Sequence, residues 1–79
     1  MTRQQAELWL RKAVGNAPRP LPGGRFPQLL AAGERAGHSR EHLLDALDMW
    51  LNYGYCQLIE QIQHDVKILP AGEAYFYRM

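Results

Sequence analysis

The amino-acid sequence predicts an α+β fold with three helices followed by a C-terminal β-hairpin, all within a single domain, residues 1–79. Two segments carry apolar residues at the same i, i+3, i+4, i+7, i+8 spacing, and each follows a capping residue, which predicts two amphipathic helices. The helical period ends at Gly54, and two strand-like runs follow, which predicts the hairpin. A chain of 79 residues leaves no room for a second domain.

The first helix is expected to begin after Thr2, because Thr2 and Gln5 fit a capping box. Its apolar stripe consists of Ala6, Trp9, Leu10, Ala13 and Val14. Gly15 favours the end of this helix. Residues 17–25 hold three prolines and two glycines, so we expect an extended connector there, with room for one short edge strand around Leu21.

A short second helix is expected over residues 28–36, because Pro27 occupies the first-turn position that helices favour for proline. Gly33 in the middle of this helix costs about 1 kcal/mol relative to alanine. It therefore indicates a close approach between two helices. Gly37 suits the left-handed position that ends a helix.

The third helix has the strongest pattern in the chain. Ser39 is its expected N-cap, and Glu41 lies in its first turn, where the helix dipole favours a negative charge. Its apolar stripe consists of Leu43, Ala46, Leu47, Trp50 and Leu51. We expect it to end at residues 52–54.

After the third helix the pattern changes to that of strands. Residues 55–62 are expected to form one strand. A turn is expected at 64–65 or at 70–72, and the aromatic run 73–79 is expected to form the second strand. The predicted hairpin therefore covers 57–77.

Composition excludes several classes of protein. No apolar run approaches the ~20 residues of a membrane span. The polar residues after Met1 do not form a signal peptide, so we expect a cytoplasmic protein. A single cysteine, Cys56, excludes an internal disulfide framework. So small a domain offers little material for a pocket, so neither an enzyme nor a bound cofactor is expected.

The candidate ligands for a metal site are His38, His42 and the free Cys56. However, His38 precedes the cap of the third helix, so the two histidines do not share one regular helical face, and no fourth ligand is evident. No metal site is therefore expected. Cys56 is expected to be buried at the entry to the hairpin.

The net charge of +1 hides an asymmetry along the chain. Residues 1–40 contain seven basic and two acidic residues, a net charge of +5. Residues 41–79 contain two basic and six acidic residues, a net charge of −4. Such a distribution can steer a charged partner if the two halves stay apart in space.

The order of elements and two segments of sequence resemble winged helix-turn-helix domains, and the resemblance covers nearly the whole chain. Residues 32–41 place the small residue Gly33 four positions before the turn glycine Gly37, which allows close crossing of two helices. Residues 46–55 end a helix with apolar pairs, then Gly54, then an apolar residue that opens the wing.

The resemblance implies that the third helix enters the major groove of DNA and that the wing contacts the flanking backbone. The exposed face of that helix would then present Ser39, Arg40, Glu41, Asp45 and Asp48. Helical spacing independently places Glu41, Asp45, Asp48 and Asn52 on one face, opposite the apolar stripe. The sequence departs from the family pattern at His38, a turn position that usually holds an aliphatic residue.

The preferred hypothesis is that the protein is a small regulator of transcription that docks on double-stranded DNA through helix 39–53 and flanking arginines, with a homodimer as a candidate assembly. The expected nucleic-acid contacts are Arg25, Arg35, Ser39, Arg40, His64 and Lys67, with Arg19 as a further phosphate contact. Winged helices commonly bind nucleic acid, which favours this hypothesis by analogy. Three carboxylates on the docking helix oppose it, because phosphates repel them.

The alternative hypothesis is a protein–protein interaction module, an adaptor or an inhibitor. Its acidic third helix would dock on a basic partner, or its tyrosine-rich C-terminal strand would pair with another chain. The residues expected at this interface are Glu41, Leu44, Asp45, Asp48, Met49, Tyr75 and Tyr77. The acidic face and the low net charge favour this alternative.

Overall fold

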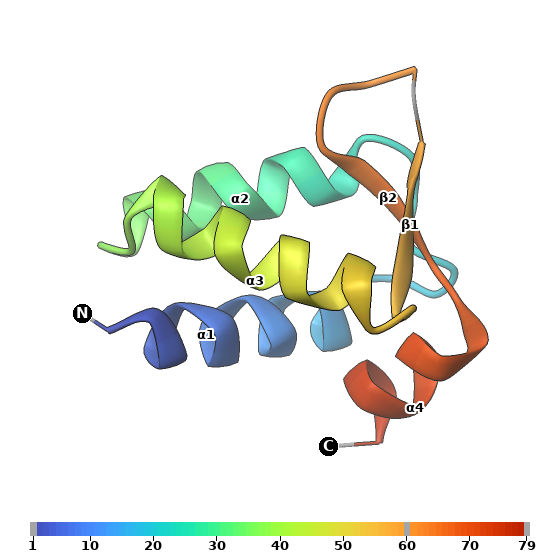
Figure 1. The fold of residues 1–79 in the computed structure, drawn as a ribbon. Coiled ribbons are helices and arrows are strands. Elements are labelled where there is room, and N and C mark those ends of the chain that lie inside the picture. Colours follow the sequence, from blue (N-terminus) through green and yellow to red (C-terminus); the bar gives the residue numbers. More distant parts are fainter. Residues whose placement is uncertain (1, 60, 79) are drawn as a thin grey trace.

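The structure is a computed structural model that describes residues 2–59 and 61–78. In this part of the chain it has four helices and one two-stranded antiparallel sheet, which confirms the α+β class (Figure 1). The elements in chain order are α1 (Arg3–Asn16), α2 (Arg25–Arg35), α3 (Arg40–Asn52), β1 (Cys56–Ile59), β2 (Asp65–Ile68) and α4 (Pro70–Tyr77).

Helices α1, α2 and α3 pack on one another and enclose most of the core (Figure 1). The buried positions of α1 and α3 are Ala6, Leu10, Val14, Leu43, Ala46, Leu47 and Trp50, as their stripes predict. Trp50 is fully buried, and its ring meets those of Phe26 and Phe76 edge-on at centroid distances of 6.5 and 4.8 Å. The outer positions of the two stripes, Trp9, Ala13 and Leu51, are half-buried.

The predicted caps of α1 and α3 are confirmed. The Thr2 hydroxyl accepts from the backbone N–H of Gln5, whose side chain accepts from the N–H of Thr2 in return. The Ser39 hydroxyl accepts from the backbone N–H of His42 at 3.1 Å. Both helices therefore begin where the sequence places their capping residues.

The turn between α2 and α3 depends on two glycines. A Cβ atom on Gly33 would lie 2.9 Å from Leu43 Cδ1 and 3.1 Å from Trp9 Cζ3, so the predicted close approach of helices is confirmed. Gly37 has φ 103°, the left-handed conformation expected of it. The backbone N–H of His38 closes the turn on the carbonyl of Gly33.

The beginning of α2 differs from the sequence prediction. The helix starts at Arg25 rather than at residue 28, so Pro27 still lies in its first turn. Gly24, with φ 79°, ends the connector directly before it, and the Gly24 N–H donates to the buried carboxylate of Asp65. Leu21 is buried in the core, and the edge strand expected there is absent from the described part of the connector.

The hairpin is shorter than the sequence predicts. β1 pairs with β2 in the register Cys56↔Ile68 to Ile59↔Asp65, so the second strand is residues 65–68 rather than 73–79. The tight turn lies just before Asp65, with His64 at φ 63°. Positions 60 and 79 of the two predicted strands lie outside the described residues.

The prediction of a strand over 73–79 is wrong, because this segment forms α4. Leu69 is the N-cap and Pro70 occupies the first turn, where its missing N–H costs nothing. Phe76 is buried against Trp50, and Gly72 packs so closely on the residue before β1 that a Cβ there would lie 1.9 Å from the Tyr55 carbonyl oxygen. Packing on the core therefore overrides the strand preference of the aromatic residues.

Among the described residues, no helix is long and apolar enough to cross a membrane.

Candidate functional site

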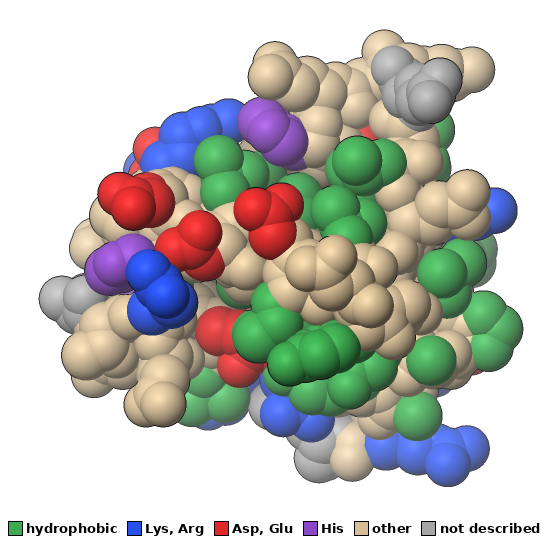
Figure 2. Space-filling view, in the orientation of Figure 1, with side chains coloured by type: hydrophobic (Ala, Val, Ile, Leu, Met, Phe, Trp, Pro, Cys, Tyr) green, Lys and Arg blue, Asp and Glu red, His purple; other side chains and the backbone are tan. Residues whose placement is uncertain are grey.

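The outer face of α3 carries a row of carboxylates, as its spacing predicts. Glu41, Asp48 and Asn52 are exposed and Asp45 is half-buried, and Figure 2 shows the acidic side chains gathered on one face over α3. The three carboxylates recur at i, i+4 and i+7, which spans about 10 Å along a helix. We call Glu41, Asp45 and Asp48 the acidic row.

The acidic row is only weakly neutralised by neighbouring cations. Arg3 Nε lies 3.2 Å from Asp45 Oδ2, but the Arg3 side chain is 68% exposed and an exposed pair of this kind contributes at most about 1 kcal/mol. Within the described residues, neither Glu41 nor Asp48 has an ion-pair partner. The row therefore keeps most of its negative potential.

Apolar side chains lie beside the acidic row. Leu44, Met49 and Leu51 are half-buried on α3 and pack against the edge of the core. Leu58, on β1 next to α3, is 47% exposed. Figure 2 shows hydrophobic side chains on this face between the acidic side chains and the hairpin. The face therefore combines a charged strip with an apolar border.

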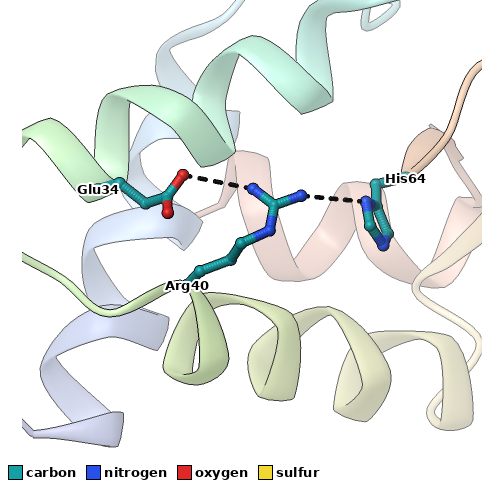
Figure 3. Close-up of polar contacts among 3 residues, drawn as sticks. All are labelled: Glu34, Arg40 and His64. Atoms are coloured by element: carbon teal, nitrogen blue, oxygen red, sulfur yellow. Dashed lines mark hydrogen bonds and ion pairs between the residues drawn. The ribbon is translucent and has the colours of Figure 1, made fainter.

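Arg40, at the first turn of α3, contacts two other elements. Its Nη1 atom donates to Glu34 Oε2 of α2 at 3.3 Å, and its Nη2 atom lies 3.4 Å from Nδ1 of His64 in the hairpin turn (Figure 3). The second contact is a hydrogen bond when the His64 proton is on Nε2, because Nδ1 then accepts. The structure thus brings together two residues of the predicted nucleic-acid set, and both are partly occupied by protein contacts.

The other residues predicted to contact nucleic acid are distributed more widely. Ser39 uses its hydroxyl to cap α3. Arg25 is half-buried at the beginning of α2, and Arg35 is exposed at its end. Lys67 is exposed on β2, opposite Gln57. Apart from Arg40, these cations lie outside α3.

Tyr75 does not form the exposed strand that the sequence predicts. It is half-buried on α4, where its hydroxyl donates to Glu7 and its carbonyl accepts from Arg11 Nε and Nη2 at 3.0 and 2.9 Å. The Arg11 guanidinium lies 3.8 Å from the centroid of its ring, which stacks on Tyr55 at 4.5 Å. Burial, followed by the hydrogen bond to Glu7, raises the pKa of Tyr75 to about 12. These contacts fasten α4 to α1.

Two polar residues that sequence reasoning missed are central to this packing. The Glu7 carboxylate also accepts from Trp50 Nε1 at 3.0 Å, so one side chain of α1 links α3 and α4. Asp65 is 1% exposed, and its carboxylate accepts from the backbone N–H groups of Gly24 and Val66. No local pattern marks these roles, because the partners lie up to 68 residues away.

Cys56 is a buried free thiol, and the Nδ1 atoms of His38 and His42 are buried without a hydrogen-bond partner among the described residues. Burial raises the pKa of the Cys56 thiol to about 11, so it stays protonated and unreactive at neutral pH. His38 is buried, with its ring 5.8 Å from that of Trp9. No group of three potential metal ligands occurs among the described residues.

No family model, curated protein or solved structure matches this chain.

Proposed function

We propose that the protein is a protein-docking module, of winged-helix type, whose α3 helix binds a basic segment of a partner protein. The observation that carries this proposal is the acidic row, three carboxylates along the outer face of α3 with little neutralisation. A partner helix with Lys or Arg side chains at the same spacing would place one cation opposite each carboxylate of the acidic row. Complementary charge of this kind gives specificity and fast association.

The apolar border supports a more specific partner, a basic amphipathic helix. Leu44, Leu51 and Leu58 would contact the apolar stripe of such a helix while the acidic row contacts its Lys or Arg residues. Helices that dock in this way combine an apolar core with a charged rim. The same surface repels the phosphates of DNA, because duplex affinity rests mainly on cations.

The test uses a synthetic amphipathic peptide with Lys at i, i+4 and i+7 beside a leucine stripe. We expect saturable binding by the native protein, and binding at least about tenfold weaker by the double variant Asp45→Lys with Asp48→Lys, because repulsion replaces attraction. Glu73→Lys makes a matched control, since it reverses an exposed carboxylate on α4.

A peptide of the same composition, with its lysines moved onto the leucine stripe, controls for simple charge attraction. Equal affinity of the double variant and the native protein for the amphipathic peptide would show that the acidic row is not the interface.

A second candidate function is binding of double-stranded DNA, and it is favoured by the contact between Arg40 and His64. These residues join the beginning of α3 to the hairpin turn, the two elements that contact a duplex in winged helix-turn-helix domains. In this candidate Arg25, Arg35 and Lys67 add phosphate contacts, and the protein regulates transcription as a homodimer. Its test is Arg40→Ala, which would weaken duplex binding in a salt-controlled titration and leave the fold intact. Unchanged affinity would remove Arg40 from the DNA site.

A further inference from the structure

A cavity of about 460 Å³ lies between the connector, β2 and α4. The side chains that matter around it are Arg19, Leu21, Lys67, Ile68, Glu73 and Tyr77. In Figure 1 the connector, the hairpin and α4 meet at the end of the molecule opposite the turn between α2 and α3. The cavity is therefore separate from the contact between Arg40 and Glu34 beside that turn.

The rim of the cavity has an excess of positive charge. Arg19 and Lys67 are both exposed and face the same space as one carboxylate, Glu73. Within the described residues, none of these three side chains has an ion-pair partner. The cations are therefore available to an anion that enters the cavity.

The wall of the cavity includes apolar side chains. Leu21 is buried and Ile68 is half-buried, so both present hydrocarbon to the cavity without a polar group of their own. A volume of about 460 Å³ lies within the range of pockets that hold small organic ligands. The cavity thus offers an apolar region next to a cationic rim.

Tyr77 adds a hydrogen-bond donor that the protein leaves unused. Its Oη atom is buried and, among the described residues, has no hydrogen-bond partner. Burial raises the pKa of Tyr77, so the hydroxyl stays protonated at neutral pH. The Arg19 guanidinium lies 4.1 Å from the centroid of the Tyr77 ring, which holds this cation at the cavity. Three buried polar atoms lack a partner among the described residues, His38 Nδ1, His42 Nδ1 and Tyr77 Oη, and of these residues Tyr77 lines the cavity.

We propose that this cavity binds a small organic anion, a carboxylate with an aliphatic or aromatic body. The carboxylate lies between Arg19 and Lys67, and the apolar body contacts Leu21 and Ile68. Tyr77 donates its hydroxyl to the ligand. Such a ligand would contact the connector, β2 and α4 at the same time, and these three elements lie side by side only in the folded protein.

The first experiment titrates benzoate and hexanoate into the protein and follows backbone amide shifts by NMR. We expect saturable shifts centred on Arg19, Lys67 and Tyr77, with dissociation constants of about 1 mM or below. Acetate and chloride serve as controls, because they carry the charge without the apolar body. Shifts of the same size from these controls, or no saturable shift with benzoate and hexanoate up to about 10 mM, would overturn the proposal.

Variants then test the assigned contacts. Arg19→Gln should weaken benzoate binding about tenfold, as expected for the loss of a charge-assisted hydrogen bond. Arg35→Gln, which removes an exposed arginine at the end of α2, should leave benzoate binding unchanged. Tyr77→Phe should also weaken binding, yet without ligand it should be at least as stable as the native protein, because it removes a buried hydroxyl that lacks a partner. Native affinity in both Arg19→Gln and Tyr77→Phe would contradict the assignment.

Discussion

Single residues far apart in the chain hold α1, α3 and α4 together. Glu7 accepts hydrogen bonds from Trp50 Nε1 and from the Tyr75 hydroxyl, so one carboxylate serves two donors from different helices. Removing it would leave both donors without their acceptor. The cost of unpaired donors away from bulk water is larger than the net value of an ordinary hydrogen bond.

We therefore predict that Glu7→Ala lowers the free energy of unfolding by about 2 kcal/mol. Urea unfolding followed by the fluorescence of the two tryptophans, Trp9 and Trp50, would measure this loss of stability. Gln4→Ala, at an exposed position of the same helix, is the matched control and should change stability far less. Equal effects of the two substitutions would show that the Glu7 hydrogen bonds contribute nothing.

The raised pKa values of the Cys56 thiol and the Tyr75 hydroxyl predict how the free energy of unfolding depends on pH. Burial raises the pKa of Cys56 from 9.0 to about 11, and burial together with Glu7 raises that of Tyr75 from 10.0 to about 12. A raised pKa means that the folded state favours the neutral group. Its contribution is therefore complete below the pKa of the unfolded chain and is lost as the pH rises through the folded value.

The free energy of unfolding should accordingly fall as the pH rises above about 9 and continue to fall to about 12. Urea titrations across this range would follow it, and Cys56→Ala should delay the onset by about one pH unit, to where tyrosine begins to ionise. The thiol should also resist aromatic disulfide reagents at neutral pH until the protein unfolds. Rapid modification of the native protein, or constant stability up to about pH 11, would contradict these assignments.

At the scale of elements, local signals predicted the first three helices and failed for the fourth. Thr2 and Ser39 mark their helix starts, because capping acts within one turn of the chain. The segment of α4 also contains a local signal, Pro70 followed by Glu73 in the first turn. The aromatic run that follows favours a strand by propensity, and its packing on Trp50 outweighs that preference.

The sequence likewise predicted the parts of the candidate site that depend on local spacing, and it did not predict the contacts between distant elements. The acidic row follows from helical spacing alone, so the sequence suffices to place Glu41, Asp45 and Asp48 on one face. The contact between Arg40 and His64 joins residues 24 positions apart, and nothing local predicts it. Pairings of this kind depend on how the elements pack, which periodicity does not encode.

The two buried helical glycines predict a graded effect on packing. A Cβ on Gly72 would lie 1.9 Å from the backbone oxygen of Tyr55, which cannot move without shifting β1. A Cβ on Gly33 would meet side chains instead, at 2.9 Å or more from Leu43 and Trp9. Alanine at either position also gains about 1 kcal/mol of helix propensity over glycine.

Gly72→Ala should therefore destabilise the protein by about 3 kcal/mol, and Gly33→Ala by clearly less. Thermal unfolding by circular dichroism would compare the two variants. An equal or larger loss in Gly33→Ala would mean that the packing of α2 on Leu43 and Trp9 is tighter than the packing of α4 on Tyr55.

At the scale of the whole molecule, folding mixes the two charged halves only in part. Arg3 from the basic half pairs with Asp45 from the acidic half, which joins the N-terminal end of α1 to α3. The acidic row nevertheless stays together, because its members share one face of one helix. The outer face of α3 is consequently negative, although the net charge of the protein is +1.

Because of this charge distribution, the most direct test compares two ligands of the native protein, random-sequence duplex DNA and the basic amphipathic peptide. Binding of each is measured by fluorescence anisotropy at about 50 and about 200 mM salt. We expect the peptide to bind with an affinity that falls as salt increases, and the duplex not to bind even at the lower salt concentration. Micromolar duplex binding that falls steeply with salt, without peptide binding, would mean that several arginines contact phosphates and that the protein binds DNA instead.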